Sequence, residues 1–163
     1  MLKSLVIWHH CRLLLNKIWD TAGQEKYHSL GISFYKGSDC CGLVFDITNS
    51  KSFETVTNWR EEFLLQAAPA DPISFPFVLI GNKVDKEREE RKVTTQKATQ
   101  WCKMNGNIPY YETSAKESIN VKEIFEQMAK LSIKNYNKSD SIPKPSPFQI
   151  PTLEGSKKEG CKC

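Results

Sequence analysis

The sequence lacks long hydrophobic runs and a strong excess of either charge. Its best apolar stretches are Leu5–Trp8, Cys40–Phe45 and Phe77–Ile80, whereas a membrane-spanning helix needs roughly 18 apolar residues. Lys and Arg together number 23 against 19 Asp and Glu, and most of the net charge of +4 lies from residue 134 onward. These observations exclude a transmembrane protein, and the basic excess is too diffuse for a nucleic-acid surface.

We expect neither a secretory signal nor a disulfide framework in this sequence. The apolar residues 1–8 are interrupted by His9–Arg12, and no small-residue cleavage site follows. Among the six cysteines, Cys40 and Cys41 are adjacent and would face opposite sides of a strand. We therefore expect reduced thiols and a cytosolic compartment.

What the sequence does contain, after Arg12, is an alternation of strand-length apolar runs with segments of helical period. This alternation predicts an α/β domain, with a mainly parallel sheet and helices on both of its faces. Two of the apolar runs are nearly continuous, which is typical of inner strands covered on both sides. The expected strands are 13–19, 42–47, 77–80 and 108–111, and the expected helices are 53–67, 95–104 and 121–133.

Residues 135–163 do not continue the alternation. Prolines recur there among Ser, Lys, Asn and Gly, with too little apolar content to offset the entropy cost of ordering, so we expect a flexible tail. The mixed-charge run 86–92 is expected to form a solvated loop or helix start without a function of its own. The chain thus divides into a segment 1–12, a domain 13–134 and a tail 135–163.

The segment Trp19–Glu25 combines groups that suit phosphoryl chemistry. Asp20 stands where its strand is expected to end, and a carboxylate in such a place can hold Mg²⁺ or one of its water ligands. The amide of Gly23 can approach a terminal phosphate closely, and Gln24 can orient an attacking water. A lone Asp-x-x-Gly is more often an ordinary strand exit, but the complete heptad is far more specific.

The segment Gly81–Asp85 follows a buried strand and lies at the edge of the sheet where open α/β folds bind ligands. An ionised Asp85 can accept two hydrogen bonds side by side from N1–H and the exocyclic amine of guanine, which adenine does not offer. The stem of Lys83 can lie along the base, and Asn82 can tie neighbouring loops together. A plain turn would explain Gly81 and Asn82 but not all of the polar positions.

A third segment, Glu112–Lys116, follows the last expected strand. Backbone amides of a tight turn at Ser114, Ala115 and Lys116 can donate to a carbonyl such as guanine O6. Taken alone, this segment is better explained as a helix N-terminus. Three such segments in order, each directly after a strand, favour a single nucleotide site.

These residues resemble the Ras superfamily of small GTPases, and within it the Rab branch. Trp19–Glu25 is similar to its switch II motif, Asn82–Asp85 to its guanine-specificity motif, and Ser114–Lys116 to its third guanine loop. The neighbouring segments are similar in sequence to the Rab of late endosomes, lysosomes and vacuoles, and the match spans roughly residues 13–130. These neighbouring segments are Tyr35–Cys41, Phe75–Phe77 and Ile108–Thr113.

The resemblance implies the P-loop nucleotide-hydrolase fold, GTP hydrolysis and a role as a switch in vesicle-mediated protein transport. It implies GTP or GDP and Mg²⁺ as ligands, with Gln24 as the catalytic residue and Asp20 as the magnesium residue, acting through water. The nucleotide-binding residues that it implies are Asp20, Gly23, Asn82, Lys83, Asp85, Ser114, Ala115 and Lys116.

The C-terminal Cys161-Lys162-Cys163 resembles the paired cysteines on which Rabs carry two geranylgeranyl groups. One lipid holds a protein to a membrane weakly and two hold it stably, so a lipoprotein on the cytosolic face of endosomal, lysosomal or vacuolar membranes is expected, with a cytosolic pool. Without the other motifs, thiols that oxidise or bind metal are the alternative. The implied partners are Rab escort protein, geranylgeranyl transferase, GDP-dissociation inhibitor and Rab effectors.

One family motif is not found. A small GTPase uses Gly-x-x-x-x-Gly-Lys, followed by Ser or Thr, to cradle the phosphates, and none of the eight glycines here is followed by Lys. The family's first strand, first helix and switch I also find no counterpart, so residues 1–12 are expected to be divergent. That first strand would lie between the strands expected at 13–19 and 42–47. Residues 2–8 can form a strand, but only in an antiparallel hairpin with 13–19, because the connection is too short for a parallel crossover.

Three hypotheses account for the absent motif: a truncated or alternatively spliced product, a misassembled gene model, or a protein that has given up nucleotide binding. They lead to three functional classes. The first is a Rab GTPase, and the second is a binding module whose tail and surface Glu25–Tyr35 engage partners without a nucleotide cycle. The third is an inert fragment. A GTP-insensitive partner interaction would distinguish the second class from the first.

Overall fold

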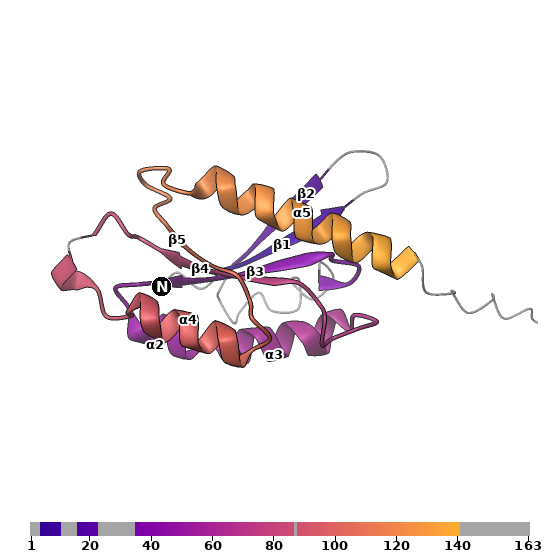
Figure 1. Cartoon of the computed structure of the whole chain (residues 1–163), viewed down its shortest axis with the longest axis horizontal. Helices are drawn as coiled ribbons and strands as arrows, with labels where there is room; N and C mark the ends of the chain where they lie inside the picture. The colour runs from indigo at the N-terminus through magenta and orange to yellow at the C-terminus, as the bar shows by residue number, and fades with distance from the viewer. Residues whose placement is uncertain (1–3, 11–15, 23–34, 87, 141–163) are drawn as a thin grey trace, which may run out of the picture.

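A computed structural model of the chain describes residues 4–10, 16–22, 35–86 and 88–140. Its centre is a five-stranded sheet with the order β2-β1-β3-β4-β5 (Figure 1). The pairs β3/β4 and β4/β5 are parallel, whereas β1 is antiparallel to both of its neighbours. Four strands therefore run in one direction, which confirms the predicted α/β class. The strands are β1 (Ser4–His10), β2 (Asn16–Ala22), β3 (Cys40–Asp46), β4 (Phe77–Asn82) and β5 (Tyr110–Thr113).

Strand β1 lies between β2 and β3, where the sheet would otherwise have a gap. It pairs with β2 as the predicted antiparallel hairpin, with Ile7 opposite Trp19. Its other edge pairs with β3, where Ser4 lies opposite Val44. The backbone groups of β3 that a gap would have left without partners are thereby hydrogen-bonded, which removes the cost of burying them unsatisfied.

Several element boundaries differ from the sequence-based expectation. Strand β2 ends at Ala22 instead of residue 19, because its pairing with β1 continues to that residue. Strand β5 begins at Tyr110 instead of residue 108, since Pro109 has no N–H for a strand ladder. The expected helix 53–67 is two helices that meet at Thr55, whose backbone N–H closes the first of them. The last helix ends at Asp140, beyond the expected limit at residue 133.

The helices form one layer on each face of the sheet (Figure 1). Helix α5 (Val121–Asp140) lies over β1 and β3 on one face. The opposite face is covered by α2 (Ser50–Glu54), α3 (Val56–Ala67) and α4 (Thr95–Met104), and a short 3₁₀ helix, η2 (Arg88–Glu90), precedes α4. No helix in the described part of the chain has the length and apolar character that crossing a membrane requires.

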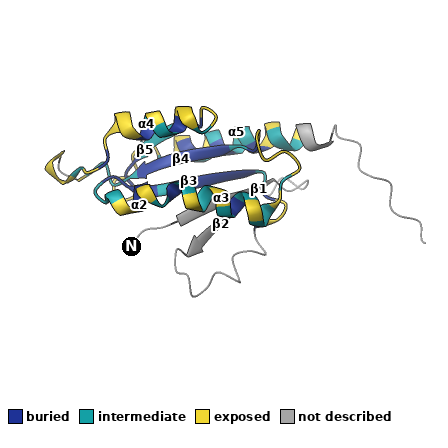
Figure 2. Cartoon of the chain, turned by 90° about the horizontal axis from the view of Figure 1, so that it is seen from below, coloured by how far each residue is buried: buried dark blue, intermediate teal, exposed yellow. Residues whose placement is uncertain are grey.

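The core is divided between the two faces of the sheet. Because side chains alternate along a strand, Cys41, Leu43 and Phe45 point toward α2, α3 and α4, while Cys40 packs with Met128 under α5. Strands β3 and β4 are buried on both sides (Figure 2), as their continuous apolar runs predicted. Each fully buried large side chain contributes about 1.5–3 kcal/mol to the hydrophobic stabilisation. This rigid centre fixes the loops that follow the strands.

Candidate guanine-base site

Two loops meet at the carboxyl ends of β4 and β5. The parallel register places Asn82 beside Thr113, so the residues that follow, 83–86 and 114–116, leave the sheet side by side. The backbone N–H of Val84 donates to the carbonyl of Thr113 across 3.0 Å. The sequence-predicted segments Gly81–Asp85 and Glu112–Lys116 therefore lie side by side, at the sheet edge where open α/β folds bind ligands.

The side chain of Asn82 joins the two loops, which is the role that we expected of it. Its Oδ1 atom accepts the backbone N–H of Ala115 across 3.0 Å and the hydroxyl of Thr113 across 3.3 Å. Its backbone carbonyl accepts the N–H of Ile47, which connects the site to the end of β3. Asn82 thus holds the turn at Ala115 in a fixed place relative to β4.

The carboxylate of Asp85 is held by the buried hydroxyl of Ser114. Ser114 Oγ donates to Asp85 Oδ1 across 2.5 Å and itself accepts the N–H of Glu117 across 3.0 Å. This hydrogen bond lowers the pKa of Asp85 below its usual 3.8, with smaller contributions from Lys116 and Lys86. The group is therefore ionised at neutral pH, and a carboxylate has acceptor sites left for two further donors.

Lys83, the first residue after β4, has an unusual backbone conformation. Its φ angle is +75°, in the left-handed region that residues other than glycine rarely adopt. Its ammonium lies 2.6 Å from Asp46 Oδ2 at the end of β3, and 36% of its side chain is exposed. The lysine therefore stands at the surface of the site with its charge directed toward a buried carboxylate.

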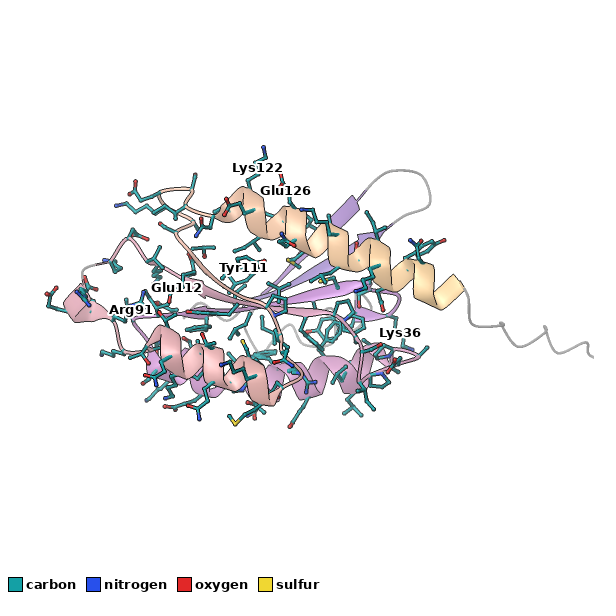
Figure 3. The ribbon with its side chains drawn as sticks, viewed as in Figure 1. Lys36, Arg91, Tyr111, Glu112, Lys122 and Glu126 are labelled. Atoms are coloured by element: carbon teal, nitrogen blue, oxygen red, sulfur yellow. The ribbon has the colours of Figure 1, made fainter. Side chains whose placement is uncertain are left out.

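A second cluster of hydrogen-bonded side chains adjoins the site and is centred on Glu112 of β5. Arg91 donates to both carboxylate oxygens, across 2.9 and 2.8 Å. The hydroxyls of Thr95 and Tyr110 also donate to Oε1, across 2.7 and 2.9 Å. Figure 3 shows Arg91 and Glu112 side by side at this end of the sheet. The arginine chiefly lowers the pKa of Glu112 to about 2, and burial raises the pKa of Tyr110.

Asp46, Arg91 and Glu112 were not predicted as site residues. The run 86–92 was expected to be a solvated loop, but Arg91 is half-buried and bound to Glu112, while Lys86, Arg88, Glu89 and Glu90 are exposed. The available signal was position: Asp46 and Glu112 stand at or near the ends of strands that lead to the site. Their partners come from distant parts of the chain, so local pattern alone does not identify them.

The residues expected to act on the phosphates lie largely outside the described part. Gly23 and Gln24 are outside it, and so are Cys161 and Cys163, the residues expected to carry lipids. Asp20 belongs to β2, where it pairs with Val6, so the expectation that the strand ends at this residue was wrong. The hairpin with β1 carries the strand past Asp20 to Ala22.

Comparison with known proteins matches the chain to a family. The model of the Ras family matches residues 6–134 of the chain. The chain is 53% identical over 147 residues to the Ypt/Rab-type GTPase ypt7 of Schizosaccharomyces pombe, which covers 90% of this chain and 71% of that protein. It is 50% identical over 153 residues to the Ras-related protein RABG3f of Arabidopsis thaliana and 49% identical over 153 residues to the Ras-related protein Rab7 of Pisum sativum. Each of these two alignments covers 93% of this chain and 74% of the relative. The chain belongs to the Ras family and, within it, to the Rab branch.

Proposed function

We propose that the chain is a guanine-binding Rab protein that acts as a membrane-traffic switch in transport from late endosomes to lysosomes or vacuoles. The observation that carries the guanine assignment is the junction of the two loops, in which Asn82 holds Ala115 and Ser114 holds Asp85. The transport role rests on similarity to proteins named Rab7 and ypt7.

The described residues fit the base half of a guanine nucleotide. The ionised Asp85 accepts N1–H and the exocyclic amine of guanine, two donors that adenine does not present together. Asn82 fixes the exposed turn at Ala115 by accepting its N–H, and the N–H of Ser114 donates to Ile119, so we assign the backbone N–H of Lys116 to the guanine carbonyl. Lys83 lays its apolar stem along one face of the base. Since hydrogen bonds within the protein join Asn82 to Ala115 and Ser114 to Asp85, little ordering is left for binding to achieve.

For the phosphate half we propose the family roles of three residues. Gly23 approaches the terminal phosphate, Asp20 supports Mg²⁺ through water, and Gln24 orients the water that hydrolyses GTP. Bound Mg²⁺ neutralises charge on the phosphates. The 163 residues contain no Gly-x-x-x-x-Gly-Lys segment, so the affinity of this chain for GDP is expected to depend mainly on the base.

That same observation favours a second candidate function. A chain without the phosphate-cradling motif can serve as a binding module that engages Rab partners and does not bind nucleotide or hydrolyse GTP. The two candidates differ in one property: partner binding depends on GTP in the first and is insensitive to it in the second.

We propose geranylgeranyl groups on Cys161 and Cys163 as the membrane attachment. Rab escort protein and geranylgeranyl transferase would add them, and GDP-dissociation inhibitor would maintain a cytosolic pool. Effectors would bind at the surface Glu25–Tyr35. Two lipids give the stable attachment that one lipid does not, which places the protein on the cytosolic face of endosomal, lysosomal or vacuolar membranes.

The test is a fluorescence titration of the full chain with labelled GDP in Mg²⁺, followed by competition with guanosine and with adenosine. We expect displacement by guanosine and not by adenosine, and loss of binding in Asp85→Asn. Asp71→Asn is the matched control, because Asp71 is an exposed aspartate in the loop that enters β4, at the opposite edge of the sheet. Binding of neither GDP nor guanosine would reject the first candidate and leave the second.

A further inference from the structure

Lys83 and Asp46 form a short ion pair. Lys83 Nζ lies 2.6 Å from Asp46 Oδ2, within the range of a charge-assisted hydrogen bond. The register of β3 with β4 explains the contact, because Asp46 pairs with Asn82 and Lys83 is the next residue. The pair therefore follows from the register of the sheet.

Asp46 is held from several directions, whereas Lys83 is held by its charge. Asp46 Oδ1 accepts the N–H and the hydroxyl of Thr48, across 2.9 and 2.7 Å. The backbone of Asp46 exchanges hydrogen bonds with Ser52, and only 6% of the residue is exposed. The carboxylate is thus a fixed anchor, and the partly exposed lysine chain is the movable member of the pair.

A lysine side chain has four rotatable bonds and loses much conformational freedom when it is fixed. If that freedom is removed before the ligand arrives, the loss no longer weakens binding. With the ammonium anchored at Asp46, the partly exposed methylene stem is the part of Lys83 that is left to pack on a base, and an apolar stem packs on a flat ring.

We propose that Asp46 is a positioning residue of the guanine site, which fixes the Lys83 side chain in its base-packing orientation before nucleotide binds. This inference rests on the proposed function, since it assigns Asp46 a role in the same site. Asp46 touches no part of the ligand and acts only through Lys83. Its removal is therefore expected to weaken guanosine binding about tenfold, the effect of leaving one long side chain to be ordered on binding.

The experiment is a double-mutant cycle with guanosine as the ligand. Asp46→Asn removes the charge and keeps an oxygen that can accept from Thr48, so it is the mildest change at this position. Lys83→Met keeps an unbranched apolar stem and removes the ammonium. The dissociation constant of guanosine is measured for the full chain, for each variant and for the double variant. Glu126→Gln is the matched control, because Glu126 pairs at 3.8 Å with Lys122 on the outer surface of α5 (Figure 3).

The inference predicts that Asp46→Asn weakens guanosine binding in the original chain and has no further effect when residue 83 is already Met. An equal loss in both backgrounds would show that Asp46 supports the loop in another way and would overturn the inference while leaving the proposed function intact. Unchanged affinity in Asp46→Asn would overturn it as well. If the original chain binds no guanosine, the proposed function fails, and the positioning role fails with it.

A second measurement covers the case in which Asp46→Asn does not fold well. The same cycle is then followed by denaturant unfolding without nucleotide, starting from Lys83→Met. The free-energy changes of the two substitutions should be non-additive, as they are for residues in direct contact. Additive changes would mean that Asp46 does not hold Lys83 in the ligand-free protein, and the inference would be wrong.

Discussion

Arg91 and Glu112 are joined by two parallel hydrogen bonds, 2.9 and 2.8 Å long, between the guanidinium and the carboxylate. About a quarter of each side chain is exposed, and Glu112 receives two further hydroxyl donors. The pair connects the loop after β4 to the end of β5, next to the residues that we assign to the guanine base. Such paired geometry is among the stronger polar contacts in proteins.

We expect Glu112→Gln to lower the free energy of unfolding by about 2 kcal/mol at pH 7, because the charge that Arg91 binds is lost. The pKa of Glu112 in the folded chain is about 2, below its ordinary 4.5. A lowered folded-state pKa gives stability that is complete above the ordinary pKa and disappears as the pH falls toward 2. The difference between the original chain and Glu112→Gln should therefore shrink from pH 5 to pH 3 in denaturant unfolding.

The control for this prediction is Glu126→Gln. Glu126 and Lys122 form an exposed pair at 3.8 Å, and such pairs contribute little to stability. The control should change the unfolding free energy by less than about 0.5 kcal/mol at any pH in this range. A constant difference between the original chain and Glu112→Gln from pH 5 to pH 3 would contradict the prediction.

Gly81→Ala is expected to destabilise the chain by about 1–3 kcal/mol through overpacking. A Cβ at this position would lie 2.7 Å from the hydroxyl of Tyr110 and 3.1 Å from both Ile47 and Phe45. Adding Tyr110→Phe removes the closest of these contacts, so the double variant should lose less stability than the two single changes summed. Denaturant unfolding measures both quantities, and a strictly additive pair would show that the hydroxyl is not the obstacle.

Gly42→Ala provides the comparison for Gly81→Ala. The nearest atoms to its new Cβ would be side-chain atoms of Met128 and Ile80, at 3.2 and 3.3 Å. Methionine is flexible and can shift, so the loss of stability should be smaller than in Gly81→Ala. An equal loss of stability at the two positions would mean that the side chains beneath α5 do not adjust to the added methyl group more easily than those around Tyr110.

The sequence predicted those elements whose signals are local. Helix α4 has the expected limits, Thr95 and Met104, because Thr94 caps its start and Gly106 follows its end. Strands β3 and β4 were found because continuous apolar runs of that length are typical of buried strands. The base-recognition loops were likewise found from motifs that are contiguous in the chain. Features that a short segment determines by itself could therefore be predicted from the sequence.

Contacts between distant segments were not predicted. The pairing of β1 with β3 depends on which strands are present to receive it, and no pattern within residues 4–10 carries that information. The same holds for Glu112, whose partner Arg91 lies 21 residues earlier. Asp20 was misplaced relative to its strand end because the extent of β2 depends on β1.

Ser114→Ala should raise the pKa of Asp85 toward its ordinary 3.8. The hydroxyl of Ser114 is the main cause of the lowered value, and alanine removes it. Carboxyl titration by ¹³C NMR measures the change. Guanosine binding requires the ionised carboxylate, so it should be lost at a higher pH in this variant than in the original chain. Ser132→Ala is the matched control, since Ser132 is a buried serine in α5 that bonds only within its helix; an equal shift of the Asp85 pKa there would refute the assignment.

Loss of one C-terminal cysteine should weaken membrane attachment, and loss of both should abolish it. If Cys161 and Cys163 each carry a geranylgeranyl group, Cys161→Ser and Cys163→Ser leave one lipid, which gives only marginal and reversible binding. The prenylated chains are compared by flotation with liposomes. Full attachment of either single variant would show that the second lipid is not needed, and Cys102→Ser, a buried cysteine in α4, serves as the control.

Asp85→Asn is expected to exchange the base preference from guanine to xanthine. Xanthine keeps N1–H but carries a carbonyl where guanine has its amine, and a carboxylate repels that carbonyl. The asparagine oxygen can accept N1–H while its amide nitrogen donates to the new carbonyl. Guanosine binding should fall by roughly 100-fold, because the amine then faces a donor, and xanthosine binding should rise. Competition titrations with the two nucleosides measure both changes in one variant. If guanosine binding falls and xanthosine binding does not rise, Asp85 supports the loop and does not read the base.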